Sequence, residues 1–451
     1  MIFTNLSTQF YCIYLFLDGK IVVWPFERHE KRTKENYKLD VEASHEINNN
    51  LFQKSHGIKG ECDLNQLRFY HPVISTNIDY MHSVLEGVVK RFFFIWFEDV
   101  DNPGSLKEYQ NMINKRLFDI KPPSFIPSKP RSTKLWRLWH AHEFLSFLLY
   151  YSLPVFFKLM PHVFFLNLMK LVLCMQHLLR KNIVREDLDT IQSILNDFVA
   201  ESESIYGKSV LLSGMHELLH LVECTKSFGP LNCVNLFQFE EINRKILRFV
   251  KGRDLISEEF LKTFSIYQAL EHFRSNCVKN KKIADFLDEH CQFKTSNKKA
   301  KKNNIINYSK ICLYDDRVLL EFENYGYTSE NRQDWLITER IHYNGILYTD
   351  NKNTSRNGDH YIVSKKGDIG SILKIVVFKD SVYFFCCRII RLLDSFYLEK
   401  YPNLKSRTFL ASATEQNFIC SITDANKVAA IYLNDRDALF ICDLSISHLF
   451  S

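Results

Sequence analysis

The sequence predicts a mixed fold, in which a largely helical region is followed by an all-β, barrel-like domain. Three observations favour this division. Residues 134–275 carry apolar side chains at helical spacing, residues 311–443 form short alternating runs bounded by Asp, Asn and Gly, and a lysine-rich stretch separates the two. A chain of 451 residues is also too long for one core.

The composition is typical of a folded intracellular protein. Hydrophobic residues make up 46% and aromatic residues 14%, which is enough to bury large cores and argues against global disorder. No Walker-type loop or dinucleotide fingerprint is recognisable. The 12 cysteines form no CxxC pair and no secretory signal is evident, so we expect reduced thiols.

The first informative local pattern lies at residues 67–97. Residues 67–78 (LRFYHPVISTNI) are rich in β-branched and aromatic side chains, which predicts a strand, and Asp79 follows at its end. Residues 81–97 have apolar side chains at helical spacing, so a helix is predicted directly after the aspartate. Five prolines between residues 103 and 130 predict an irregular connection.

Six helices are predicted after that connection. The segment 185–205 has the most regular 3.6-residue period. The apolar stretch 144–157 is only 14 residues long and contains Pro154, so it is predicted to be a buried helix and not a membrane span. The six predicted helices are 134–152, 155–180, 185–205, 211–227, 239–251 and 255–275.

The C-terminal module is predicted to consist of short strands. The runs IVVF and VYFFCCRII flank Lys379-Asp380, as the strands of a hairpin flank their turn. No internal repeat is visible. The predicted strands are 311–324, 340–348, 359–364, 370–378, 382–393, 407–413, 417–422, 428–433 and 437–443.

Three sequence blocks resemble one known family. IDYMHSVLEGVVKRFFFIW (78–96) resembles the D-x-MH-x-V-x-x-G-V segment of CACTA-type (EnSpm-like) DNA transposases. WHAHEFLSFLLYYSLPVF (139–156) is similar to the family's WKASEFRxxLLFYSLPV helix, and residues 215–246 resemble its H-x-LLHL…GPL…FxFE-x-x-N block. The similarity extends over about residues 5–275, and the β module resembles a domain that follows the transposase in animal members.

The resemblance implies an α/β RNase H-like core, here incomplete, with a large all-α insertion. In such a core, carboxylates hold two divalent cations, Mg²⁺ or Mn²⁺, for phosphoryl transfer on DNA. Asp79 matches the family's second acid and Glu240 its third, with Asn243 in the same motif. The implied domains are a truncated core at 1–102, the helical insertion at 103–236, the end of the core at 237–275, a basic linker at 276–310 and the β domain at 311–451.

Each of these site residues also has a plain structural interpretation. Asp79 is in the position of a helix N-cap, and Glu240 lies beside another glutamate, as on an exposed helix face. His82 either orients the carboxylate or a DNA phosphate, or is a core histidine. His216 and His220, at i and i+4, either bind a metal or pack structurally, and no third ligand is evident.

The N-terminus departs from the family pattern. Residues 5–20 (NLSTQFYCIYLFLDGK) match only pieces of the segment that follows the family's first catalytic aspartate, so that aspartate is expected upstream of Met1. Asp18 does not match its position. Two carboxylates without the third hold two cations poorly, so we expect the metal pair not to be functionally bound and the chain to be catalytically inactive.

The sequence therefore favours a transposase-derived protein from a cut-and-paste transposon, nuclear or cytoplasmic, with residual DNA binding. A cluster of lysines in the linker is a candidate for phosphate contacts, for nuclear import, or simply for a solvated linker. The four lysines proposed to contact DNA are Lys298, Lys299, Lys301 and Lys302.

Two alternatives stay open at this point. One is an active metal-dependent transposase or nuclease, if the reading frame extends upstream of Met1. The other is a chromatin-binding or partner-binding protein that uses the β domain. In that domain Tyr325, Tyr327 and Trp335 form either an aromatic cage or an aromatic core.

The composition of residues 276–310 yields a first prediction. Their charge density and low apolar content cannot bury a core, so we expect trypsin to cut there first and to yield two stable fragments. Limited proteolysis with mass spectrometry measures this. Resistance of these lysines to trypsin would contradict the assignment of a linker.

Overall fold

The structure is a computed structural model that divides into two compact units. The first comprises Met1–Asn235, Tyr308–Ile341 and Leu347–Ser451, and the second Leu236–Asn307 and His342–Ile346. Each unit is described by itself. The structure describes residues 15–17, 21–24, 26, 32–45, 58, 60–70, 72–73, 75–252, 254–276, 281–283, 285, 307–312, 316–327, 335–352, 358–378, 381–392, 396 and 398–443.

The predicted strand at 67–78 is wrong, because the described residues of this stretch form turns. A short 3-10 helix, η3 (Asp63–Gln66), precedes them, and Phe69 is 89% exposed. Among the described residues no strand pairs with this stretch, and β-prone side chains without a partner strand do not make a strand. The elements described before this point are β1 (Leu15–Leu17), its antiparallel partner β2 (Ile21–Val23) and α1 (Lys34–His45).

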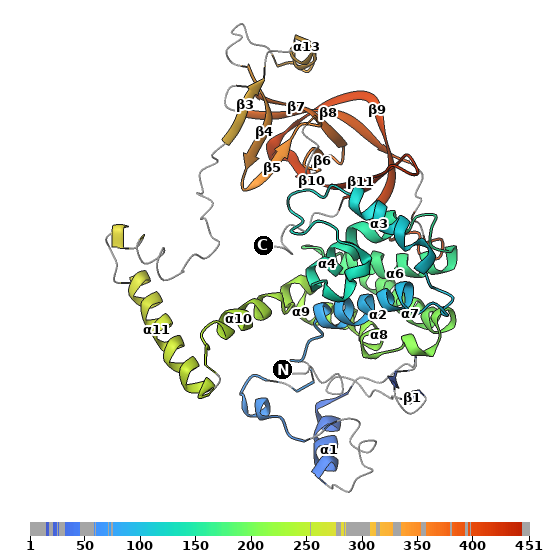
Figure 1. Cartoon of the computed structure of the whole chain (residues 1–451), viewed down its shortest axis with the longest axis vertical. Helices are drawn as coiled ribbons and strands as arrows, with labels where there is room; N and C mark the ends of the chain where they lie inside the picture. Colours follow the sequence, from blue (N-terminus) through green and yellow to red (C-terminus); the bar gives the residue numbers. More distant parts are fainter. Residues whose placement is uncertain are drawn as a thin grey trace. The chain divides into compact units, whose positions relative to one another are not determined.

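The helical region confirms that residues 134–275 are mainly helical, but several boundaries differ from the prediction. Predicted helix 134–152 is a 3-10 helix followed by a new helical run from Ala141, and predicted helix 211–227 is two helices, α8 (Ser213–Leu218) and α9 (Leu221–Phe228). The predicted break between residues 152 and 155 lies instead at 157–161, because the π-helical turn Phe147–Tyr151 directly precedes the helix that contains Pro154 and the helical run continues through the proline. Figure 1 shows these elements in sequence colours. They are η4 (Met81–Val89), α2 (Lys90–Phe97), η5 (Lys107–Tyr109), α3 (Gln110–Asp119), η6 (Thr133–Leu138), α4 (Ala141–Ser146), η7 (Phe147–Tyr151), α5 (Ser152–Phe156), α6 (His162–Leu178), α7 (Asp187–Tyr206), η8 (Lys208–Val210), α8 (Ser213–Leu218), α9 (Leu221–Phe228) and η9 (Leu231–Val234).

An aromatic cluster forms the centre of this region. The ring of Phe93, on α2, lies 5.0 Å from that of Trp139 and 4.9 Å from that of Phe147, centroid to centroid. Trp96 lies 5.0 Å from Phe156 in the same way. Such aromatic pairs add about 0.5–1.5 kcal/mol each beyond the area that they bury. The first two sequence blocks that carry the family resemblance therefore pack against each other in the core.

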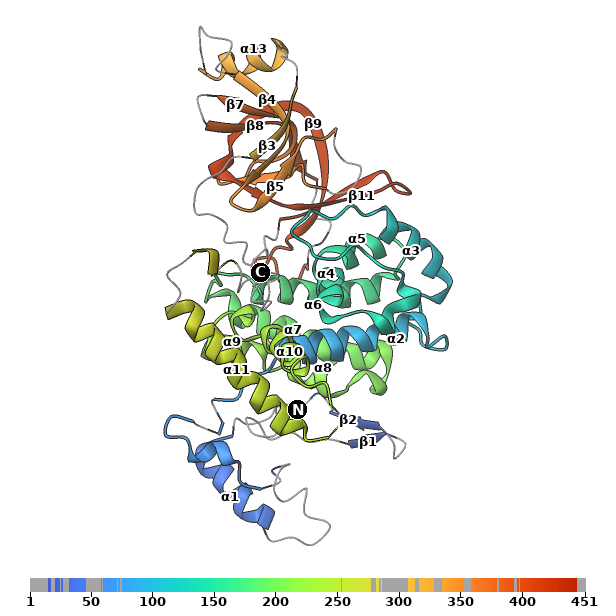
Figure 2. The same cartoon turned by 60° about the vertical axis from the view of Figure 1, so that its left-hand side comes forward.

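The C-terminal module is a strongly curved antiparallel sheet, visible from two directions in Figures 1 and 2. Its main path runs β10-β6-β7-β8-β9-β12-β11, with β4 joined to β7, β3 and β5. The register between β7 and β8 pairs Phe378 with Ser381, as predicted for a hairpin. The strands are β3 (Asn307–Cys312), β4 (Trp335–Tyr343), β5 (Ile346–Thr349), β6 (Tyr361–Ser364), β7 (Ile369–Phe378), β8 (Ser381–Arg391), β9 (Thr408–Ser421), β10 (Ala425–Lys427), β11 (Ala429–Leu433) and β12 (Ala438–Cys442).

The module is not purely β, which corrects the prediction of a strand at 311–324. That stretch contains the end of β3 and a helix, α13 (Asp316–Asn324). Val318, Leu319 and Phe322 are all buried and follow helical spacing, so their burial against the sheet selects a helix. The coarse prediction of a helical region and a curved sheet is confirmed.

A buried ion pair ties the sheet to the helical region within the first unit. Lys427 of β10 and Asp359, just before β6, pair with side chains only 3% and 1% exposed. Asp359 Oδ1 also accepts a hydrogen bond from the backbone N–H of Ser124 at 2.8 Å, and Lys427 Nζ donates to Ser124 Oγ at 3.2 Å. The loop between α3 and η6, which contains Ser124, is therefore fixed to the sheet by two buried charged side chains.

Arg116 of α3 makes a second connection of the same kind. Its guanidinium binds both carboxylate oxygens of Asp435, in the turn between β11 and β12, and donates to the carbonyl oxygens of Val155 and Phe157 at 2.7 and 2.8 Å. The arginine side chain is 2% exposed. These bonds use the planar fork of donors that only arginine offers.

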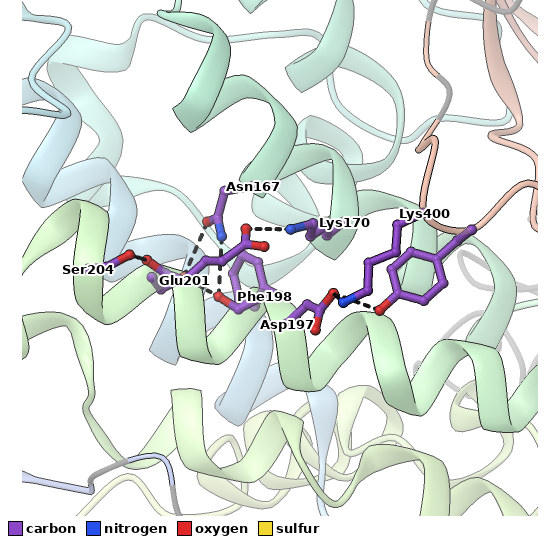
Figure 3. A network of polar contacts seen from close by, with 9 residues as sticks. Asn167, Lys170, Asp197, Phe198, Glu201, Ser204 and Lys400 are labelled. Atoms are coloured by element: carbon purple, nitrogen blue, oxygen red, sulfur yellow. Dashed lines mark hydrogen bonds and ion pairs between the residues drawn. The ribbon is translucent and has the colours of Figure 1, made fainter.

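Figure 3 shows a third polar contact, between α6, α7 and the turn before β9. Asp197 on α7 pairs with Lys400 and accepts a hydrogen bond from the Tyr401 hydroxyl at 2.7 Å. One turn further on, Glu201 pairs with Lys170 of α6. The α6–α7 pair therefore anchors residues of the C-terminal module, which belongs to the same compact unit.

The second unit contains α10 (Phe237–Leu247) and α11 (Ile256–Asn276). Phe249 in the turn between them contacts Phe264 and Tyr267 of α11, at ring centroid distances of 6.2 and 5.4 Å. Most of the linker 276–310 lies outside the described residues. Within the described part of the chain, no helix is both long and apolar enough to cross a membrane.

The buried ion pair leads to a stability prediction. We expect Asp359→Ala to lower the free energy of unfolding by roughly 3–5 kcal/mol, because Lys427 is left charged and buried. Chemical unfolding monitored by circular dichroism measures this. The matched control is Asp424→Ala, which breaks the exposed Lys365–Asp424 pair of the same sheet and should cost at most about 1 kcal/mol. Equal costs would contradict the assigned role.

Candidate functional site

Asp79 lies at the start of the helix formed by η4 and α2, and its side chain is buried. One carboxylate oxygen, Oδ2, accepts a hydrogen bond from the backbone N–H of His82 at 3.0 Å. The same oxygen lies 2.6 Å from Nδ1 of the His82 ring. The first N–H groups of a helix have no partner within it, so the carboxylate supplies one, as an N-cap does.

His82 connects this buried carboxylate to the surface. Its side chain is 48% exposed, whereas that of Asp79 is 5% exposed. The ring is therefore held by Nδ1 on the carboxylate while a large part of it reaches the protein surface. Of the two interpretations of His82, a residue that orients the carboxylate is therefore supported, and a core histidine is not.

Glu217 of α8 is a residue near Asp79 that the sequence analysis missed. Burial raises the pKa of the Glu217 carboxyl to about 8, and the negative charge of Asp79 adds to this rise. At neutral pH Glu217 is therefore mostly protonated and able to donate a hydrogen bond. The available signal was an acidic residue inside the otherwise apolar MHELLHL segment (215–221).

Two glycines bring α8 against η4. A Cβ on Gly214 would lie 2.5 Å from the carbonyl oxygen of Ser83, and one on Gly87 would lie 3.5 Å from Cα of Gly214. A side chain therefore does not fit at Gly214, and one at Gly87 would be tight mainly against the carbonyl oxygen of His82, 3.1 Å away. The crossing brings the helix that begins the third sequence block onto the first block, and with it Glu217 near Asp79.

His216 and His220 contact each other. Their Nε2 atoms are 3.2 Å apart, and the side chains are 1% and 7% exposed. One ring donates through Nε2 to the Nε2 of the other, so the two histidines pair with each other inside the helical region. Among the residues that the structure describes, no group of three or more His, Cys, Asp or Glu side chains is placed to hold a metal ion.

The remaining predicted site residues lie in the second unit or outside the described residues. Glu240 and Asn243 are exposed on α10 in the second unit, whereas Asp79 belongs to the first. A shared carboxylate site therefore stays a prediction. Asp18 and the linker lysines Lys298, Lys299, Lys301 and Lys302 lie outside the described residues.

The aromatic residues singled out in the β module belong mainly to its core. Trp335 is 8% exposed and stacks on Phe378 with ring centroids 4.0 Å apart, and Tyr327 contacts Tyr383 at 4.9 Å. Tyr325 is exposed, and its hydroxyl donates to the carbonyl of Asn417. Core packing accounts for the first two, so the geometry favours an aromatic core over a cage.

Comparison with known proteins adds no assignment to this geometry. No family model, curated protein or solved structure matches the chain.

The raised pKa of Glu217 predicts a pH dependence of stability. Between about pH 5 and about pH 8 the folded state holds a proton that the unfolded state has lost, so the free energy of unfolding should fall as the pH rises. Glu217→Gln keeps a neutral group and should remove this part of the slope. Urea unfolding at several pH values tests it, with the exposed Glu186→Gln as control. An unchanged slope in Glu217→Gln would contradict the assignment.

Proposed function

We propose that this chain is a transposase-derived protein that no longer catalyses DNA cleavage or strand transfer. The resemblance to CACTA-type transposases supports the first part. It rests on three separate blocks, and the contacts among them are a further support. Phe93 and Trp96 of the first block pack on the second, and Gly87 of the first lies against Gly214, the residue directly before the third.

The environment of Asp79 supports the second part, and it carries the proposal. A catalytic aspartate holds a cation through the lone pairs of its carboxylate oxygens, and hydrogen bonds to an oxygen compete with the cation for them. Here Oδ2 of Asp79 is engaged by the N–H and the ring of His82. The nearby acid, Glu217, is mostly protonated at neutral pH, and a protonated carboxyl is a poor ligand for a hard cation. The described residues around Asp79 therefore do not fit a two-cation site.

The RNase H-like core remains part of this proposal. Its support is the order of the three blocks and the helix that starts directly after Asp79. Between residues 60 and 276 the described residues form helices and turns without a strand. Residual DNA binding through the linker lysines and a nuclear location belong to the same proposal and have the charge of that segment as support.

A cleavage assay on DNA tests the proposal. The full chain should show no strand cleavage in Mg²⁺ or Mn²⁺ on DNA that carries terminal inverted repeats, because Asp79 serves the helix and not a cation. Gel electrophoresis of end-labelled DNA is the measurement. Metal-dependent nicking that is lost in Asp79→Ala, and kept in the control Glu241→Ala, would overturn it. A folded Asp79→Asn variant guards against loss by unfolding, since an asparagine also caps a helix.

A further inference from the structure

A separate surface pocket lies between α3 and η6, away from the residues discussed so far. Its volume is about 340 Å³, near the lower end of the range for small-molecule sites. Basic and amide side chains from two segments line it, and a buried tryptophan closes one side. The lining residues used below are Lys107, Gln110, Asn111, Thr133, Lys134 and Trp136.

The floor of the pocket consists of buried polar groups that hold one another in place. Gln110 is 5% exposed and donates from Nε2 to the hydroxyl of Thr133 at 3.2 Å. Thr133 in turn donates from its N–H and its hydroxyl to Oδ1 of Asn114, at 2.7 and 3.0 Å. This chain fixes the glutamine amide, and the amide still has a second N–H to offer to a ligand.

The rim of the pocket is positively charged. Lys107, Lys134 and Asn111 are exposed there. The carboxylate on the wall, Glu98, is already engaged, because it pairs with Arg137 and accepts a hydrogen bond from Nε1 of Trp136 at 2.8 Å. With Glu98 balanced by Arg137, the two lysines leave a net charge of +2 at the rim.

The surrounding segment is basic as well. Residues 107–137 contain eight Lys and Arg against two Asp and Glu, a net charge of +6. The whole chain also carries +6, so the remainder is balanced. The segment that builds this pocket is therefore one of the basic parts of the chain, and its charge draws anions toward it.

We propose that this pocket binds a phosphate group. A phosphate monoester carries close to two negative charges at neutral pH and has several acceptor oxygens, which match two lysines at the rim and the second N–H of the Gln110 amide below them. The phosphate comes either from a DNA strand or from a soluble phosphate monoester. The pocket does not involve Asp79, so the inference stands apart from the proposed function.

The test measures binding of two probes to the full chain. Isothermal titration with inorganic phosphate and with adenosine monophosphate detects a soluble ligand, and fluorescence anisotropy with a labelled single-stranded DNA detects a strand. Lys107→Ala and Lys134→Ala should each weaken binding of the preferred probe by about tenfold or more, the loss expected for one charge-assisted hydrogen bond. The exposed lysines Lys115 and Lys121 of the same segment serve as controls, each as an alanine variant.

The outcomes separate the sources. Binding of phosphate or the nucleotide that depends on Lys107 and Lys134 supports a soluble ligand, and binding of DNA alone with the same dependence supports a strand. Two results would overturn the proposal: no binding of any probe, or equal losses in the pocket and control variants. The second result would mean that the segment attracts anions only by its overall charge.

Discussion

The burial of one helix, η4 continued into α2, is the constraint on which the helical region depends. Phe92, Phe93 and Trp96 of α2 are at most 1% exposed, and helices from the second and third sequence blocks pack around them. The start of this helix is fixed by the carboxylate of Asp79, and its middle by the glycine crossing with α8. A shift of its axis would expose aromatic rings and push backbone against backbone, so its position tolerates little change.

The sheet is joined to this helical core mainly by charged groups. Arg116 and Lys427 are almost fully buried. Arg116 of the helical region pairs with Asp435 of the sheet, whereas Lys427 pairs with Asp359 of the same sheet. Burying such charges costs free energy unless their donors are hydrogen-bonded. The sheet and the helical region can therefore pack only in a position that keeps these bonds. Aromatic contacts such as Phe157 with Phe440, 5.3 Å apart, add the hydrophobic part. The C-terminal module therefore covers Phe157 and pairs with Arg116, two residues of the helical region.

The spacing of apolar residues predicted those elements that bury one face against the core. The helices of the central region were recognisable because each has an apolar face that packs on the core, as in α7 with Leu188, Ile191 and Leu195. The prediction of a strand at 67–78 failed although Val73 and Ile78 are buried, because their burial comes from packing in turns and irregular backbone, and no sequence pattern shows which side chains will find a partner strand. At 316–324 three apolar residues fit either a strand or a helix, and packing against the sheet decided for α13.

The site was predictable only in part, for a related reason. Asp79 and His82 are three residues apart, so their contact follows from one helical turn. Glu217 reaches Asp79 only through the crossing of two helices, and the phosphate pocket joins Lys107 to Lys134 across a proline-rich connection. Both depend on the path of the chain in space, which spacing along the sequence does not give.

A carboxylate at the start of a buried helix suits two roles, and in this chain the two compete. As a cap it accepts the otherwise unpartnered N–H of His82, which contributes about 1 kcal/mol to stability. As a metal ligand it would have to turn the same oxygen toward a cation. The capping energy is by itself a sufficient physical reason for an aspartate three residues before His82. The match to a transposase motif therefore indicates a shared helix start, whereas activity depends on whether the oxygens of Asp79 are available to a cation.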